Sequence, residues 1–178
     1  MNAAAGEFLL SVVIPAYNYA RTLPRAVASV MPQLRNDCEL IIIDDGSTDA
    51  TPDVITELQK SYPGQIRAER KCNGGPASVR NRGIQLARAE WLIFLDADDE
   101  MSEGAVERIR AHLHANPDTR FVAGGHLSVS PDGKRAQRAP GSMPDAPLAR
   151  LRAYLLDKRL TLSNGACVMH KDVFQRGV

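Results

Sequence analysis

The fold class of this chain follows from one stretch, Leu40-Ile41-Ile42-Ile43-Asp44-Asp45-Gly46-Ser47, in which four apolar residues run directly into two aspartates and a glycine. Apolar runs without regular polar alternation are typical of strands covered on both faces, as in parallel sheets. Other runs share this character: Leu9 to Ile14, Trp91 to Leu95 and, more weakly, Gln65 to Glu69. The sequence therefore predicts a central sheet of parallel strands.

Amphipathic segments lie between the apolar runs. Apolar stripes at helical spacing occupy positions 23–31, 54–62 and 105–113, and a further helix is expected from Gly74-Gly75-Pro76 to about Ala89. Strands that alternate with helices are typical of an α/β domain. We therefore expect a Rossmann-like α/β sheet with helices on both faces.

The composition is that of an ordinary globular protein of about one domain. The chain has 178 residues, of which 24% are charged and 44% are apolar. Lys and Arg together number 22 and Asp and Glu 21, so the net charge of +1 provides no overall attraction to nucleic acid, and no nucleic-acid partner is expected. Any attraction to a charged partner must be local.

Cysteine use and the start of the sequence predict a cytoplasmic location. Cys38, Cys72 and Cys167 form no CxxC motif, and we expect buried, unreactive thiols in a reducing compartment. The apolar stretch Phe8 to Ala16 has no preceding basic residue and is too short to span a bilayer, so neither a signal peptide nor a transmembrane segment is expected. Peripheral attachment to the inner face of a membrane remains open.

The pattern changes after Pro117. We expect strands at Phe121 to Ala123 and at Ala166 to Met169, and a short helix around Leu148 to Leu155. A basic stretch rich in proline, glycine and alanine, ending at Pro147, is expected to be mainly loop. The composition of that stretch indicates no particular partner.

Five acidic residues gather where the strand at Trp91 to Leu95 ends. They are Asp96, Asp98, Asp99, Glu100 and Glu103, and no basic residue lies among them. Ligands of parallel sheets bind beyond the carboxyl ends of the strands, and a divalent cation would relieve the repulsion between these carboxylates. Carboxylate oxygens suit Mg²⁺ or Mn²⁺, which take further ligands from water and substrate phosphates. The alternative is a solvated helix start, where acidic side chains complement the helix dipole.

Basic residues dominate the segment from 65 to 90, which carries six basic side chains against two acidic ones, a net charge of +4. We expect Arg80 to face a phosphate group, together with the free N–H groups of a helix that begins at Gly74-Gly75-Pro76. A solvent-exposed arginine and simple helix capping are the alternatives. Asp44-Asp45 suits a turn before a helix and also a hydrogen bond from a nucleobase, with Tyr17 as an aromatic contact.

Four motifs in this order resemble those of family 2 glycosyltransferases. They are Val13-Ile14-Pro15-Ala16-Tyr17-Asn18, then Ile43-Asp44-Asp45-Gly46-Ser47-Thr48-Asp49, then Asn73-Gly74-Gly75-Pro76 through Arg80-Asn81-Arg82-Gly83, and finally Phe94-Leu95-Asp96-Ala97-Asp98-Asp99. Together the motifs extend over about half of the chain, which makes the resemblance specific. The resemblance implies a GT-A fold, a nucleotide-diphospho-sugar donor that is often UDP-linked, Mn²⁺ or Mg²⁺, and inverting transfer to an acceptor hydroxyl.

The resemblance also implies roles for individual residues. Those expected to bind the nucleotide-sugar are Pro15, Ala16, Tyr17, Asn18, Asp45, Arg80 and Asp96. Asp45 would accept a hydrogen bond from a uracil imide if the donor is UDP-linked, and Arg80 would face the diphosphate. Asp96-Ala97-Asp98 matches the family's DxD motif. Asp98 would therefore ligate the metal, and Asp96 would touch the ribose or a metal-bound water. Asp99 is the alternative metal ligand.

By the same resemblance, residues 1–178 form a single GT-A-like domain, with a donor-binding part at 8–117 and an incomplete acceptor-side part at 118–178. In the family, the base that takes the acceptor proton lies in a Glu-Asp motif further along the chain. We therefore expect this base downstream of Val178, in a domain truncated at its C-terminus. Asp157 and Asp172 are poor substitutes.

Two other functions remain open. An apolar strand followed by Asp96-Ala97-Asp98 also resembles an aspartate-nucleophile phosphatase, although that family has glycine where Asp99 stands here. The chain can also be a fragment that binds the donor and performs no transfer. No histidine spacing matches a helical zinc site, and we expect four structural histidines, His112, His114, His126 and His170.

Overall fold

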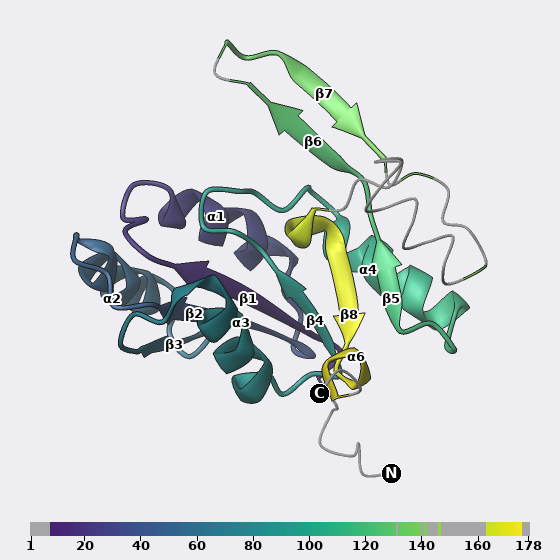
Figure 1. Cartoon of the computed structure of the whole chain (residues 1–178), viewed down its shortest axis with the longest axis horizontal. Coiled ribbons are helices and arrows are strands. Elements are labelled where there is room, and N and C mark those ends of the chain that lie inside the picture. Colours follow the sequence, from purple (N-terminus) through teal and green to yellow (C-terminus); the bar gives the residue numbers. More distant parts are fainter. Residues whose placement is uncertain (1–7, 131, 140, 142–145, 147–162, 176–178) are drawn as a thin grey trace.

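The structure, a computed structural model, describes residues 8–130, 132–139, 141, 146 and 163–175. Within these residues the main sheet has six strands in the order β3-β2-β1-β4-β8-β5 (Figure 1). Their bounds are β1 (Leu10–Ala16), β2 (Cys38–Asp44), β3 (Ile66–Arg70), β4 (Trp91–Phe94), β5 (Phe121–Ala123) and β8 (Cys167–His170). The strands predicted from sequence are thus confirmed as elements of one sheet.

Strand β1 lies between the strands that carry the conspicuous aspartates. It pairs in parallel with β2 from Leu10↔Cys38 to Ala16↔Asp44, and in parallel with β4 from Leu10↔Trp91 to Val13↔Phe94. Because parallel neighbours point the same way, the carboxyl ends of β2, β1 and β4 meet at one edge of the sheet. This edge is called the carboxyl rim below.

Strand β8 runs opposite to the four parallel strands. It runs antiparallel to both β4 and β5, with Leu92↔Met169 and Val122↔Val168 as paired positions. The expectation of parallel strands is therefore confirmed for β1 to β4, and the sequence analysis assigned no direction to β8. Its direction is not readable from the sequence, since β5 and β8 are only three and four residues long and show no periodicity that fixes direction.

Helices cover both faces of the sheet, as predicted (Figure 1). One face packs against α1 (Leu23–Val30), α2 (Thr51–Ser61) and α4 (Ala105–Ala115), and the other against α3 (Gly75–Leu86) and α6 (Asp172–Gln175). Alternation along β1 divides the core, because Val12 and Ile14 belong to the first cluster and Val13 to the second, all fully buried. No helix within the described ranges has the length and apolar composition of a membrane span.

Two helix ends differ from the predictions. The third helix stops at Leu86 rather than near Ala89, because Ala87 is extended and the Arg67 guanidinium takes the Leu86 carbonyl at 3.0 Å. The first helix ends at Val30, and the chain continues through Pro32 as a short 3-10 turn, η1 (Met31–Gln33). Proline is tolerated there because the first residues of a helical turn need no N–H donor.

The region after β5 contains more structure than the sequence indicates. Strands β6 (His126–Val129) and β7 (Arg135–Arg138) form an antiparallel hairpin that the prediction of a loop-rich stretch missed. Gly133, with φ of 80°, provides the left-handed residue of the turn. A 3-10 turn, η2 (Asn164–Ala166), precedes β8, whereas the helix predicted around Leu148 to Leu155 lies outside the described residues.

We predict that Gly83→Ala destabilises the protein by about 1–3 kcal/mol, because α3 packs too closely on β1 to accept a methyl group. A Cβ atom at this position would lie 2.6 Å from Cγ1 of Val13, a fully buried residue. Urea unfolding measures the effect, and Asn81→Ala on the exposed side of the same helix is the control. Equal stability of the Gly83→Ala variant and the parent would contradict this close approach.

Candidate functional site

The carboxyl rim brings together the loops that follow β1, β2 and β4. Backbone hydrogen bonds fasten each loop at its origin, since the Asp45 N–H donates to the Ala16 carbonyl at 2.8 Å and the Leu95 N–H to the Val13 carbonyl at 2.9 Å. The loop residues predicted to bind a nucleotide-sugar therefore start from one edge of the sheet.

Asn18 connects the first two loops. It adopts a left-handed backbone with φ of 60°, which asparagine tolerates better than most residues. Its side-chain oxygen accepts hydrogen bonds from the Thr48 N–H at 2.8 Å and the Asp49 N–H at 3.2 Å, while its own N–H donates to Ser47. The Asn18 side chain thus holds the loops together, whereas the neighbouring Tyr17 side chain is 45% exposed and open to a ligand.

Asp45 anchors the start of α3. Its carboxylate is only 3% exposed and accepts hydrogen bonds from Lys71 Nζ at 2.6 Å, the Gly74 N–H at 3.0 Å and the Gly75 N–H at 2.8 Å. Burial raises the pKa of Asp45, but these donors outweigh burial, and the pKa lies below its ordinary value. The predicted contact of Asp45 with a uracil imide stays a prediction, since protein donors surround the carboxylate here.

The neighbouring Asp44 has a structural role. Its buried carboxylate accepts a hydrogen bond from the Ser47 N–H at 2.9 Å and lies 3.2 Å from Arg70 Nε. Arg70 also donates to the Ser47 carbonyl at 2.8 Å. Asp44 therefore stabilises the turn before α2, which is one of the two roles that the sequence suggested for Asp44-Asp45.

The loop after β4 gathers several acidic side chains. Asp98 and Asp99 are exposed and Asp96 is half-buried. Partial loss of solvent, and then the charges of Asp98 and Asp96, raise the pKa of the Asp99 carboxyl. Burial and then Asp98 raise the pKa of Tyr19, so the Tyr19 hydroxyl also lies in the field of these acids. The carboxylates gather as predicted, but no three metal-ligating side chains converge to enclose an ion within the described part of the chain.

Arg80 reaches this acidic loop from α3. Its Nη2 atom lies 3.3 Å from Oδ1 of Asp96, and its Nε atom is buried with no hydrogen-bond partner among the residues that the structure describes. A buried donor without a partner is costly, and an anion at the rim would satisfy it. The structure thus brings together Arg80 and Asp96, two residues that the sequence analysis assigned to one ligand.

A polar stripe on α1 holds the acidic loop in place, and the sequence analysis missed it. Arg25 donates to the Asp98 carbonyl at 3.0 Å and pairs with Glu100 at 2.8 Å. One turn further on, Ser29 Oγ accepts from the Met101 N–H at 2.9 Å. Two turns further on, Gln33 accepts from the Val106 N–H at 3.4 Å. The signal was available as polar residues at i, i+4 and i+8 beside the apolar stripe.

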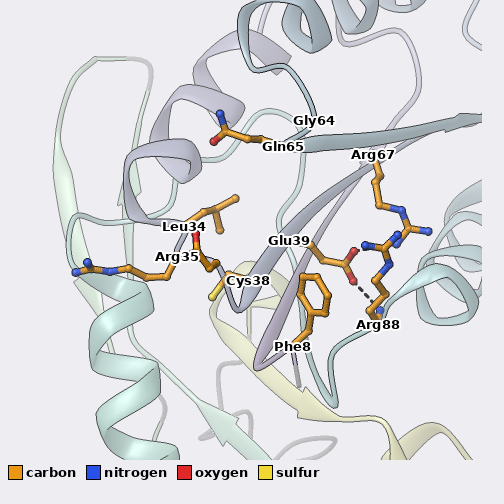
Figure 2. Close-up of a pocket in the computed structure, with 10 residues that line it drawn as sticks. Phe8, Leu34, Arg35, Cys38, Glu39, Gly64, Gln65, Arg67 and Arg88 are labelled. Carbon is orange, nitrogen blue, oxygen red and sulfur yellow. Dashed lines mark hydrogen bonds and ion pairs between the residues drawn. The ribbon is translucent and has the colours of Figure 1, made fainter. Parts of the chain in front are cut away.

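A hollow of about 310 Å³ lies at the opposite edge of the sheet, lined among others by Phe8, Cys38, Gln65 and Arg88, where four parallel strands begin. Figure 2 shows the Glu39 carboxylate beside Arg67 and Arg88, with dashed lines to both residues. Glu39 is buried and accepts from Ser11, Arg67 and the Arg88 N–H at 2.6–2.8 Å. Because protein donors satisfy this carboxylate, its role is to close the sheet rather than to bind a ligand.

The histidine and cysteine residues described next show no arrangement typical of a catalytic group. His170 stacks edge-on against Trp91, with ring centroids 5.1 Å apart, and Trp91 is buried as predicted. Cys38 and Cys167 are buried, and burial raises the pKa of both thiols. The expectation of a buried thiol is wrong for Cys72, which is exposed because it follows β3 in the loop before α3.

The chain belongs to glycosyltransferase family 2, because the sequence profile of that family, described as Glycosyl transferase family 2, matches residues 11–178. An uncharacterized glycosyltransferase of Nostoc sp. is 45% identical over 100 residues, which are 56% of this chain and 31% of that protein. Chondroitin synthase of Pasteurella multocida is 37% identical over 125 residues, or 70% of this chain and 13% of the synthase. The chain thus spans less than a third of these two relatives.

Solved structures confirm the fold expected from the motifs. S. aureus TarS 1-349 in complex with UDP-GlcNAc has a TM-score of 0.72 and 21% identity, covering 94% of this chain and 46% of that chain. Mannosyltransferase PcManGT from Pyrobaculum calidifontis, in complex with GDP-Man and Mn²⁺, has a TM-score of 0.68 and 16% identity with the same coverage. The fold is therefore GT-A, and the chain spans about half the length of these neighbours. The family assignment excludes the alternative of an aspartate-nucleophile phosphatase.

We predict that Asp45→Asn lowers the free energy of unfolding at pH 7 by about 2–4 kcal/mol, because a neutral amide replaces a buried carboxylate bound by Lys71 and two N–H groups. The pKa of Asp45 lies below its ordinary value in the folded protein, so its contribution is present above about pH 4 and declines at lower pH. Urea unfolding across this range should show the two proteins converging. Asp53→Asn, at an exposed site in α2, is the control; a difference that does not depend on pH would refute the ionised role of Asp45.

We also predict that Ser29→Ala loosens the acidic loop. Loss of the acceptor for the Met101 N–H should speed exchange of that amide by about fivefold or more, as expected for about 1 kcal/mol. Hydrogen exchange followed by mass spectrometry measures this. Ser61→Ala is the matched control, because Ser61 bonds only within its own helix, to the Glu57 carbonyl. Unchanged exchange near Met101 would show that α1 does not hold the loop.

Proposed function

We propose that this chain provides the donor-binding part of an inverting glycosyltransferase that moves a sugar from a nucleotide-diphospho-sugar, with UDP as the nucleotide, to an acceptor hydroxyl. The observation that carries the proposal is the placement of Arg80 and the carboxylates of Asp96, Asp98 and Asp99 at one rim of the sheet. A cationic donor and uncompensated acids at one place suit a diphosphate bound with a divalent cation.

The acidic loop fits Mn²⁺ or Mg²⁺ of the kind that is shared with a substrate. Partial burial and then the neighbouring carboxylates raise the pKa of Asp99, yet the described residues form no closed cage of ligands. Mg²⁺ in particular is usually held by one or two carboxylates plus phosphate oxygens. We assign Asp98 as the principal ligand, with Asp96 and Asp99 beside it. The cation supplies positive charge that stabilises the diphosphate leaving group.

The chain's own residues orient the donor and stabilise charge. Arg80 would exchange its contact with Asp96 for the diphosphate, which also satisfies its buried Nε atom. The start of α3, fixed by Asp45, directs further N–H groups and the positive end of a helix dipole to the same rim. Tyr17 is exposed at the end of β1 and suits contact with the nucleoside.

Inversion requires a carboxylate on the acceptor side to take the hydroxyl proton as the new bond forms. Asp172 is not that group, because it follows the end of β8 beside the first residue of β4, and its carboxylate lies 3.3 Å from His170 Nδ1, at the edge opposite the rim. Asp157 lies outside the described residues. We place the base in the segment that follows Val178 in longer family members. The relatives include a chondroitin synthase and a poly(ribitol-phosphate) β-glucosyltransferase, which supports a polysaccharide or polymer hydroxyl as acceptor.

The test is calorimetric titration of UDP in the presence of Mn²⁺ and again with EDTA. We predict binding that requires the metal and is weakened about tenfold or more by Asp98→Ala, because a principal carboxylate ligand is lost. Asp118→Ala, which removes an exposed aspartate remote from the loop that follows β4, should bind like the parent.

Titration with GDP tests which nucleobase the site prefers, and tighter binding of GDP would reject UDP as the nucleotide. Equal affinity of the Asp98→Ala variant would reject the metal assignment. Release of UDP from a UDP-sugar, with water as acceptor, separates a transferase from a domain that binds the donor without turnover. Metal-dependent UDP binding with no such release would favour the second.

A further inference from the structure

The β6–β7 hairpin stands apart from the main sheet. Among the described strands these two pair only with each other, from His126↔Arg138 to Val129↔Arg135, and Figure 1 shows the ribbon projecting beyond the body of the molecule. Isolated two-stranded hairpins are at best marginally stable in water, so a projecting hairpin gains little as a purely structural element.

In strand β6 the apolar side chains are exposed and the polar side chains are half-buried. Along β6 the half-buried positions are His126 and Ser128, whereas the exposed positions are Leu127 and Val129. Leu127 is 50% exposed and Val129 is 60% exposed. An amphipathic strand normally turns its apolar side chains toward the protein and its polar ones toward water. Outward apolar side chains at alternate positions therefore indicate a surface that meets another apolar phase.

The same ribbon is basic. Between His126 and Arg138 there are three basic side chains against one acidic one, a net charge of +2, although the whole chain carries only +1. All four residues of β7 are exposed, and Arg135 lies directly across from Val129 on the outer face. Arg135 thus shares the outer face with the two aliphatic side chains, whereas Arg138, opposite His126, alternates to the other face.

The size of this face distinguishes between possible partners. Specific protein–protein interfaces bury about 1,200–2,000 Å², far more than two aliphatic side chains and a few cations provide. A soluble polyanion would use the cations but give the aliphatic pair no apolar surface to enter. An anionic bilayer can bind both kinds of side chain, since lipid phosphates attract basic side chains and the acyl boundary accepts apolar ones.

We propose that the outer face of the β6–β7 hairpin docks on the surface of an anionic lipid bilayer, with Leu127 and Val129 entering the headgroup region beside Arg135. This inference does not depend on the proposed transferase function, because it rests on the hairpin alone.

Docking at this face would place the carboxyl rim near the bilayer. The hairpin root is tied to η2 by a 2.7 Å hydrogen bond from the Gly124 N–H to the Ala166 carbonyl. η2 in turn packs at the acidic loop, where a Cβ on Gly165 would lie 3.8 Å from Oδ2 of Asp99. The membrane contact and the candidate site are thus adjacent.

Co-sedimentation of the chain with vesicles tests the proposal. We expect binding to phosphatidylcholine vesicles that contain about 30% phosphatidylglycerol, none to phosphatidylcholine alone, and weaker binding as salt rises. The double variant Lys134→Gln/Arg135→Gln should weaken partitioning about 25-fold, since each basic residue near an anionic surface contributes about fivefold. Leu127→Ser/Val129→Ser should weaken it about tenfold or more.

Two matched controls separate the hairpin from general surface effects. Lys60→Gln/Arg108→Gln removes two exposed basic residues elsewhere, and Val173→Ser removes an exposed aliphatic side chain that is 41% exposed on α6. Both should sediment like the parent. All substituted hairpin positions are exposed, so the variants should fold normally, which circular dichroism and thermal unfolding verify.

Three results would overturn the proposal. The first is the absence of sedimentation with anionic vesicles. The second is retained sedimentation of the Leu127→Ser/Val129→Ser variant together with binding of the parent to soluble polyphosphate, which would show a face that recognises polyanions by charge alone. The third is a dimer in lipid-free solution, detected by light scattering, that the same aliphatic variant dissociates, because the apolar face would then join two copies of the chain.

Discussion

The structure depends on one constraint, which is that β1 is covered on both faces and paired on both edges. Val12, Val13 and Ile14 are fully buried, and β2 and β4 take the backbone hydrogen bonds on either side. A strand in this position accepts a polar side chain only where a partner satisfies it, as Glu39 does for Ser11 near the strand starts, because an unpaired polar group inside a sheet costs free energy that packing does not return. The aspartates at the ends of β2 and β4 lie at the carboxyl rim, where the candidate site forms.

Acidic and basic groups face each other at the carboxyl rim. The acidic loop after β4 gathers several carboxylates, and α3 faces it with Arg80 and a helix start. Asp45 joins the two sides by fixing the first N–H groups of α3, while the polar stripe of α1 holds the backbone of the acidic loop from behind. Catalytic groups that are held by such secondary contacts lose less freedom when a ligand binds, which is the general advantage of preorganisation.

Much of this arrangement was predictable from the sequence. The first four strands, the helices between them and the gathering of Asp96, Asp98 and Asp99 follow from apolar runs that end in acids, a strong local signal. The direction of β8 and the existence of the β6–β7 hairpin were not predictable, because segments of three or four residues pair through partners distant in the chain. The contacts of Asp45 were equally hidden, since Lys71 and Gly74 lie 26 and 29 residues away.

The sequence by itself determined the first four strands, the helices between them and the chemistry that collects at the strand ends, because hydrophobic periodicity and turn residues act over a few neighbouring positions. The tertiary structure alone decided which aspartate is engaged and which is open. Asp44 and Asp45 became buried acceptors of protein hydrogen bonds, whereas Asp98 and Asp99 stayed exposed beside Arg80 and α1. Adjacent aspartates look alike in sequence, and only the donors that folding brings within hydrogen-bonding distance distinguish a structural carboxylate from one that is free to bind a ligand.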